Sequence, residues 1–185
     1  PKDFLAANPE ATMDVVEIDP ALPPLAQRFF RHRPDPRLRV FNQDGRLFLN
    51  RSPGPYDVVF LDAYRADDST PPQLATVEAL QRVREALVPQ GVVLANLLGT
   101  PRGRGAALLR RQVAGFRRVF ASVFVFQVDP ARRATDPQNL TLVALKDVRA
   151  FVTLPGEVAR SERTLRALLT GRDDEPLTDD HAPVE

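Results

Sequence analysis

Short apolar runs alternate with amphipathic stretches along this chain, and this alternation most constrains its fold. Strand-like runs stand at 13–20, 38–43, 56–62 and 92–96. Stretches with apolar residues at three- and four-residue steps, which predict helices, stand at 22–31, 73–87 and 106–119, and a shorter helix is expected at 46–50. Alternation of this kind is typical of β-α units, whose strands lie parallel in one sheet. The pattern therefore predicts an α/β fold.

The last two strand-like runs, at 123–128 and 140–145, have only a polar link between them. Two consecutive strands with no helix between them are expected to pair antiparallel. The prediction is a mostly parallel sheet with one antiparallel strand near an edge. Beyond Lys146 the periodicity fades, and we expect a short helix at 160–170 and an acidic tail at 173–185. We assign 1–150 to one domain and 151–185 to a C-terminal helix and tail of the same domain.

Composition excludes several classes of function. The 185 residues contain no cysteine, so disulfides and thiolate metal sites are excluded. His32 and His181 lack metal-ligand spacing, and we predict no metal. No apolar run is long enough for a membrane span, and a net charge of +1 gives no reason to expect nucleic acid. One stretch is rich in arginine, and we interpret it as a solvated helix face; it contains Arg102, Arg104, Arg110, Arg111, Arg117 and Arg118.

Three acids stand at the ends of three successive strand-like runs: Glu17, Asp44 and Asp62. Ligands of open α/β sheets bind beyond the carboxyl ends of the strands. An ionised carboxylate can accept hydrogen bonds from both hydroxyls of a ribose, and this role suits Glu17. Asp44 precedes Gly45, which permits close backbone approach, so this pair suits an adenine. Asp62 leaves an apolar strand and is placed to orient and deprotonate an amine.

Each acid also has a plainer interpretation. Glu17 is then a solvated strand-end residue, Asp44 part of an Asp-Gly turn before the helix at 46–50, and Asp62 a helix N-cap or loop acid. The ordered set of three favours a nucleoside site over these alternatives.

The ordered motifs resemble those of spermidine synthases, which are polyamine aminopropyltransferases. The resemblance covers 1 to about 145 and the tail. The later motifs resemble those of a bacterial spermidine synthase-like subgroup, some of whose members are fused to membrane domains. It rests on Val16-Glu17-Ile18-Asp19, Asp35-Pro36-Arg37-Leu38-Arg39-Val40, Asp44-Gly45-Arg46, Tyr56-Asp57-Val58-Val59, Asp62-Ala63-Tyr64, the stretches 71–80 and 91–96, and the ending 177–185.

The resemblance implies a class I methyltransferase-like (Rossmann-like) fold and particular roles. Glu17 would bind the ribose of decarboxylated S-adenosylmethionine, a co-substrate rather than a tightly bound cofactor. Asp44 and Gly45 would bind adenine, and Asp62 would activate the attacking amine. Substrate contacts are expected at Tyr64, Arg65 and Asn96. The implied partners are small-molecule nucleoside and amine substrates, with a possible homodimer. The implied location is the cytoplasm, or a cytoplasmic domain of a longer, membrane-fused protein.

The sequence departs from the family at three places. Arg65 stands where the family has a second aspartate that holds a diamine, and Asn96 where it tends to have glutamine. An alternative is that Asp67 and Asp68 replace the missing aspartate if the loop is shifted. The family's first strand and glycine-rich loop have no counterpart, so we expect an N-terminally truncated domain that binds nucleoside poorly by itself. Two other functions stay open: an S-adenosylmethionine-dependent methyltransferase, with Arg65 as a candidate for binding the cofactor carboxylate, and a non-catalytic relative.

Overall fold

The computed structural model describes residues 1–30, 33–51, 54–64, 70–103, 105–147, 162, 165–169 and 174–181. The chain divides into two compact units, residues 1–51 and 52–185. The sequence predicts one continuous sheet. In the described residues each unit has its own sheet, one of two strands and one of four. The assignment of 1–150 to one domain, and the absence of a first strand, remain predictions.

The first unit is a two-stranded parallel sheet with three helices. Its elements are α1 (Lys2–Ala7), β1 (Met13–Glu17), α2 (Leu22–Phe29), β2 (Leu38–Asn42) and α3 (Gly45–Asn50). β1 and β2 are in register from Met13 against Leu38 to Glu17 against Asn42. The Asn42 side-chain amide donates to the carbonyls of Glu17 and Ile18, at 2.9 and 3.2 Å. The carboxyl ends of the two strands are therefore held side by side.

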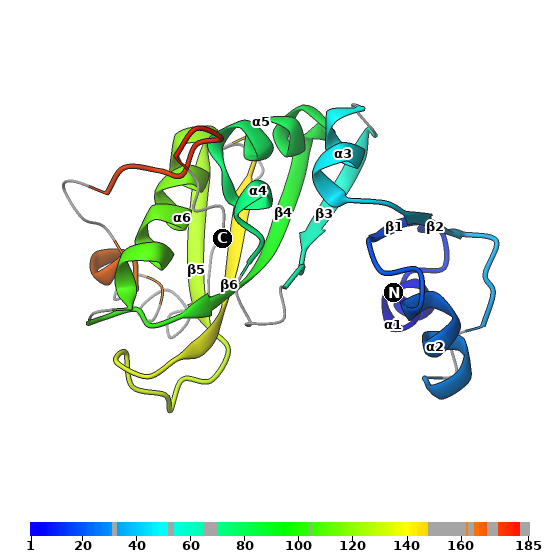
Figure 1. Ribbon diagram of the computed structural model, residues 1–185, viewed down its shortest axis with the longest axis horizontal. Helices are drawn as coiled ribbons and strands as arrows, with labels where there is room; N and C mark the ends of the chain where they lie inside the picture. The colour runs from blue at the N-terminus through cyan, green and yellow to red at the C-terminus, as the bar shows by residue number, and fades with distance from the viewer. Residues whose placement is uncertain are drawn as a thin grey trace. The chain divides into compact units, whose positions relative to one another are not determined.

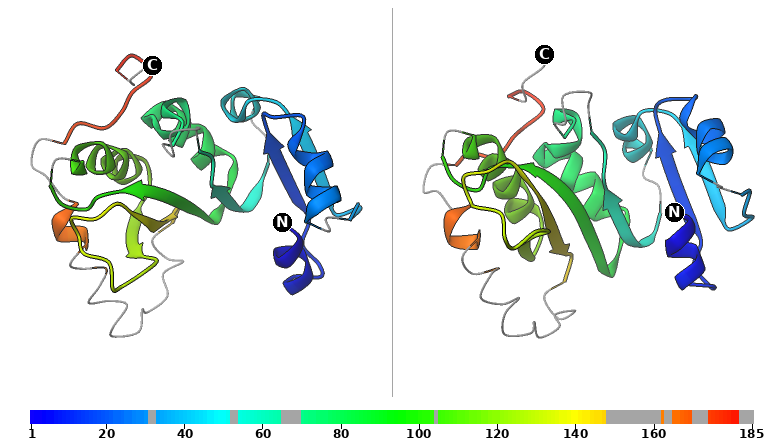
Figure 2. Two further views of the ribbon diagram at one scale, coloured as in Figure 1. Left: turned by 60° about the horizontal axis from the view of Figure 1, so that its bottom comes forward. Right: turned by 90° about the horizontal axis from the view of Figure 1, so that it is seen from below.

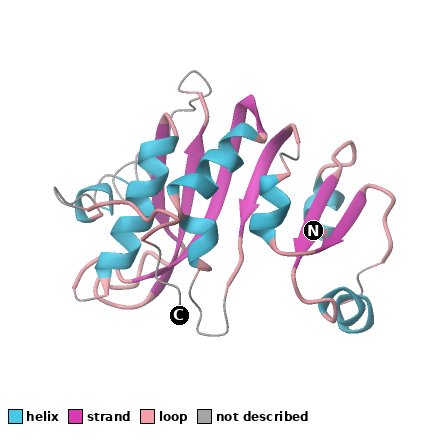
Figure 3. Cartoon of the chain, turned by 45° about the horizontal axis from the view of Figure 1, so that its top comes forward, coloured by secondary structure: helices cyan, strands magenta, loops and turns pink. Residues whose placement is uncertain are grey.

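The second unit is a four-stranded sheet with the order β3-β4-β6-β5 (Figures 1 and 3). Its elements are β3 (Tyr56–Leu61), α4 (Pro72–Ala75), α5 (Val77–Glu85), β4 (Leu87–Gly99), α6 (Ala106–Val119), β5 (Ser122–Gln127) and β6 (Gln138–Leu145). β3 and β4 are parallel, and β6 is antiparallel to both of its neighbours. The predicted hairpin is confirmed, and so is the single antiparallel strand beside the edge. α6 has the predicted bounds.

The core of this unit lies where α5 and α6 pack against each other and against β4, on one face of the sheet (Figure 2). Leu80, Val83 and Val113 are fully buried there, and so are Val93 and Leu142 of the sheet. A methyl group at Gly115 of α6 would lie 3.3 Å from a Leu80 methyl, which is tighter than ordinary contact. Glycine at this position therefore allows α6 to approach α5 closely.

The single helix predicted at 73–87 is wrong, because the structure has two helices that meet at Thr76. The Thr76 hydroxyl accepts a hydrogen bond from the backbone N–H of Ala79 at 3.2 Å, which is an N-cap for α5. Leu87 no longer belongs to a helix and begins β4. Pro89-Gln90-Gly91, expected to end the helix, lies within that strand, where the register against β3 shifts between Tyr56 and Val58.

The arginine-rich face of α6 contacts the C-terminal segment, so its interpretation as a merely solvated face is wrong for three arginines. Arg110 Nε donates to both carboxylate oxygens of Asp174 at 3.1 Å. Arg111 and Arg117 donate to the carbonyls of Glu175 and Leu169, each at 3.1 Å. Burial lowers the pKa of Arg117, and repulsion from Arg166 acts in the same direction. Residues 165–168 are helical, within the range predicted for a short C-terminal helix.

Candidate active site

Glu17 and Asp44 lie at the same edge of the first unit's sheet. Glu17 is the last residue of β1, and Asp44 follows the end of β2 by two residues. Because β1 and β2 are parallel neighbours with Glu17 opposite Asn42, the two acids leave the sheet at its carboxyl edge. This is the edge at which ligands of α/β sheets bind. The structure thus brings together the two residues that the sequence assigned to the nucleoside.

Both carboxylates also have local hydrogen bonds. Glu17 Oε1 accepts from the backbone N–H of Asp19 at 2.8 Å, which fixes one oxygen of a half-buried side chain. Asp44 Oδ1 accepts from the backbone N–H of Leu47 at 3.0 Å and so caps α3. Gly45 is the first residue of that helix. The Asp-Gly turn into a helix is therefore present, and the role of Asp44 and Gly45 in binding adenine remains a prediction.

Asp62 and Asn96 meet where β3 ends and its neighbour β4 continues to Gly99. β3 ends at Leu61, which is opposite Ala95 of β4, so the next residue of each strand lies at the same level. The Asn96 side-chain amide donates to Asp62 Oδ1 at 3.1 Å. Asp62 is not the N-cap of the next described helix, because Pro71 occupies the N-cap position of α4. The result is an exposed carboxylate with one oxygen oriented by a neighbouring strand.

The two remaining substrate candidates follow Asp62 in the chain. Tyr64 is half-buried. Arg65 lies outside the described residues, and so does its predicted contact with substrate or cofactor. Glu17 and Asp44 are in the first unit and Asp62 and Asn96 are in the second, so a single site that contains all four is also a prediction.

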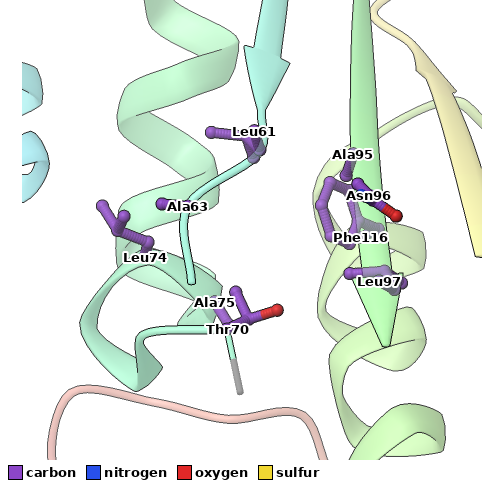
Figure 4. A pocket seen from close by; sticks show the side chains of 9 residues that line it. All are labelled: Leu61, Ala63, Thr70, Leu74, Ala75, Ala95, Asn96, Leu97 and Phe116. Atoms are coloured by element: carbon purple, nitrogen blue, oxygen red, sulfur yellow. The ribbon is translucent and has the colours of Figure 1, made fainter. Parts of the chain in front are cut away.

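A small apolar cavity lies beside Asn96 (Figure 4). One wall comes from the end of β3 and from α4, and the other from β4 and α6. The lining residues are Leu61, Ala63, Thr70, Leu74 and Ala75 on the first wall, and Ala95, Asn96, Leu97 and Phe116 on the second. Its volume of about 20 Å³ is room for about one water molecule. None of these nine lining residues is charged. The described lining therefore suits a small uncharged group, about the size of one water molecule.

Thr76 is the residue near this site that the sequence reasoning missed. It joins the pocket-lining helix α4 to α5 and is completely buried. A threonine that precedes an apolar helical run is a recognised N-cap signal. The signal was hidden because apolar residues continue at helical spacing on both sides of it, from Leu74 to Leu80.

The described residues contain no group of three or more histidine or acidic side chains that could hold a metal ion. Within the same residues, none of the helices has both the length and the apolar character needed to cross a membrane.

No protein-family model matches the chain. A curated relative, the polyamine aminopropyltransferase of Vibrio vulnificus, is 32% identical over 131 residues, which are 69% of this chain and 42% of that protein. The solved structure of a probable spermidine synthase from Corynebacterium glutamicum superimposes with a TM-score of 0.79 over 98% of this chain and 68% of that one, at 21% identity. The chain is therefore similar in sequence to a polyamine aminopropyltransferase and in fold to a spermidine synthase.

A second solved structure, human methyltransferase-like protein 13 in complex with SAH, has a TM-score of 0.70 and 24% identity, and covers 97% of this chain and 82% of that one. The two structural likenesses show that this chain has the methyltransferase-like α/β fold. The chain spans less than half the length of the Vibrio vulnificus relative.

Proposed function

We propose that the protein to which this chain belongs transfers an aminopropyl group from decarboxylated S-adenosylmethionine to an amine acceptor. The observation that carries the proposal is the Asp62–Asn96 pair, in which the residue after the carboxyl end of β3 is hydrogen-bonded to the parallel neighbour β4 beside an apolar pocket. The 32% identity to a polyamine aminopropyltransferase supports the same reaction class.

The reaction is a displacement at the carbon next to the sulfonium. The amine nitrogen forms a bond to that carbon as the carbon–sulfur bond breaks, and the electron pair goes to sulfur, which becomes the neutral thioether of methylthioadenosine. An alkyl amine is protonated near pH 7 and must lose a proton before it attacks. Asp62 accepts that proton on Oδ2, because its other carboxylate oxygen, Oδ1, accepts a hydrogen bond from the Asn96 amide at 3.1 Å. The acid also holds the amine in line, which removes much of the entropic cost of the reaction.

The nucleoside half of the co-substrate would bind at the carboxyl edge of β1 and β2. Glu17 would accept hydrogen bonds from the two ribose hydroxyls. The Asp44 side chain and the backbone N–H of Gly45 would form hydrogen bonds with the edge of the adenine ring. The common edge of the two strands supports this assignment. The co-substrate class is further supported by the human structural neighbour, whose structure contains SAH.

The described pocket argues for an acceptor with a single charged amine. The free ammonium of a bound diamine needs a carboxylate partner, because burying an unpaired charge is costly. Among the described lining residues, Leu61, Leu74, Leu97 and Phe116 provide apolar surface, and Asn96 and Thr70 are the polar members. Asp67 and Asp68, the other acids that follow Asp62 in the sequence, lie outside the described residues. The family's second aspartate is replaced by Arg65 in the sequence, which is consistent with this acceptor.

A second candidate is methyl transfer from S-adenosylmethionine. It is favoured by the structural likeness to human methyltransferase-like protein 13, which has higher sequence identity than the spermidine synthase neighbour. Methyl transfer requires that the cofactor carboxylate be recognised, and aminopropyl transfer requires that this carboxylate be absent. The two reactions therefore predict opposite preferences between methylthioadenosine and S-adenosylhomocysteine.

Calorimetric titration of the full-length protein with these two products tests the proposal. Aminopropyl transfer predicts that methylthioadenosine binds more tightly, whereas an equal or reversed preference would contradict it. A Glu17→Gln variant is the control, since it should weaken the binding of both ligands to the same extent.

We also propose a cytoplasmic location and a homodimer, and sedimentation of the full-length protein tests the dimer.

A further inference from the structure

Residues 174–181, which we call the strap, lie against α5 and α6 (Figure 1). At one end Asp174 receives both of its 3.1 Å hydrogen bonds from Arg110 of α6. In the middle, the carbonyl of Leu177 accepts from the backbone N–H of Val77 at 2.8 Å, and the Leu177 side chain is 1% exposed. A segment with this much burial and hydrogen bonding is an integral part of the second unit.

The strap is tied most closely to the junction between α4 and α5. The Thr76 hydroxyl donates to Asp179 Oδ1 at 2.7 Å while it accepts from Ala79 N–H. The backbone N–H of Asp179 in turn donates to Glu78 Oε2 at 3.0 Å. A hydroxyl that donates to a carboxylate makes a charge-assisted bond, which is stronger than a neutral one. Asp179 therefore fixes both the cap of α5 and the point at which α4 ends.

α4 is the helix that supplies a wall of the pocket beside Asn96. Leu74 and Ala75 line that pocket, and Ala75 is the residue directly before Thr76. With only four residues, α4 has little helical stability of its own. The position of α4 therefore depends on the contacts at its two ends. At its C-terminal end, the contact is the hydrogen bond between Thr76 and Asp179.

We propose that the strap positions the acceptor pocket and that Asp179 is its positioning residue. Asp179 acts through Thr76 on α4. The identity of the acceptor rests on the function proposed above, but the effect on α4 does not.

The test compares three variants of the full-length protein. Asp179→Ala removes the acceptor, Asp179→Asn keeps a side-chain oxygen for the Thr76 hydroxyl, and Asp180→Ala removes the neighbouring exposed carboxylate as a matched control. Hydrogen exchange is measured at the Leu74 amide of α4, which donates to the carbonyl of the N-cap residue Pro71, and at the Val93 amide in the buried centre of β4. KM for the acceptor amine and Kd for methylthioadenosine are measured in parallel.

Asp179→Ala should increase exchange at Leu74 and KM for the acceptor by about tenfold each, the effect of one lost charge-assisted hydrogen bond. In the same variant, exchange at Val93 and Kd for methylthioadenosine should not change. Asp179→Asn should show only a small increase in exchange at Leu74 and in KM, and Asp180→Ala should change neither. Equal increases at Leu74 and Val93 would show that the strap only stabilises the fold. Unchanged exchange at Leu74, or unchanged KM with faster exchange, would also overturn the proposal. If the protein transfers methyl instead of aminopropyl groups, KM is measured for the methyl acceptor. If it transfers neither, exchange at Leu74 relative to Val93 decides.

Discussion

Replacing Asp62 by asparagine removes the proposed proton acceptor and leaves the local structure nearly intact. In the structure Asp62 Oδ1 accepts from the Asn96 amide at 3.1 Å. An asparagine at this position keeps an oxygen that can accept the same hydrogen bond. The free energy of unfolding should therefore change by less than about 1 kcal/mol, which is the net value of a typical hydrogen bond.

The effect on turnover should be far larger. A positioned acid or base contributes about 10²- to 10⁴-fold to a rate. At about 1.4 kcal/mol for each factor of ten, this is roughly 3–5 kcal/mol of barrier height. Asp62→Asn should lower kcat by at least about 100-fold. It should leave Kd for methylthioadenosine unchanged, because the residues proposed to bind the nucleoside, Glu17 and Asp44, are elsewhere in the chain.

The assay follows labelled aminopropyl transfer by the full-length protein, with thermal unfolding of each variant measured in parallel. Asp57→Asn is the matched control, since Asp57 is an exposed aspartate on the same strand. A kcat for Asp62→Asn within a few-fold of the unmodified protein would refute the assignment of Asp62 as proton acceptor. An equal loss in Asp57→Asn would show that the strand as a whole, rather than Asp62, is sensitive to lost charge.

Three further predictions concern the nucleoside residues and the core. Glu17→Gln should weaken methylthioadenosine binding about tenfold in calorimetry, because a neutral amide is a poorer acceptor for two hydroxyls. Asp44→Ala should lower stability by about 1 kcal/mol through the lost cap of α3, whereas Asp44→Ser should keep the cap and lose only nucleoside affinity. Leu80→Ala should cost about 2–5 kcal/mol in chemical denaturation, because this side chain is fully buried between α5 and α6; a loss below 1 kcal/mol would contradict the packing described.

The elements that the sequence predicted well are those whose signal is local. α6 has continuous helical periodicity through Leu109, Val113 and Phe116, and all three side chains are buried as expected. The hairpin of β5 and β6 follows from two apolar runs with no helix between them. In both cases the apolar pattern and the chain connectivity suffice, and no distant contact has to be known.

The elements that the sequence predicted poorly depend on contacts with residues far away in the chain. The break at Thr76 is stabilised by Leu177 and Asp179, about a hundred positions later. The continuation of β4 through Gly91 depends on Lys146, whose backbone N–H donates to the Gly91 carbonyl at 3.1 Å. Turn-forming residues such as Pro89-Gln90-Gly91 carry no signal for such a partner.

The candidate site divides in the same way. Strand ends and parallel pairing explain why Glu17 lies beside Asp44, and why Asp62 lies beside Asn96. Sequence spacing alone did not show that Asp44 also caps α3, since a capping aspartate and a ligand-binding aspartate have the same pattern at a strand-to-helix turn.

The most direct test of the central claim is a transfer assay that offers the full-length protein both co-substrates. Decarboxylated S-adenosylmethionine and S-adenosylmethionine, each labelled in the group to be transferred, are incubated with a panel of monoamines and diamines. The account predicts aminopropyl transfer with release of methylthioadenosine, and a preference for monoamine acceptors. Methyl transfer from S-adenosylmethionine in the absence of any aminopropyl product would contradict it.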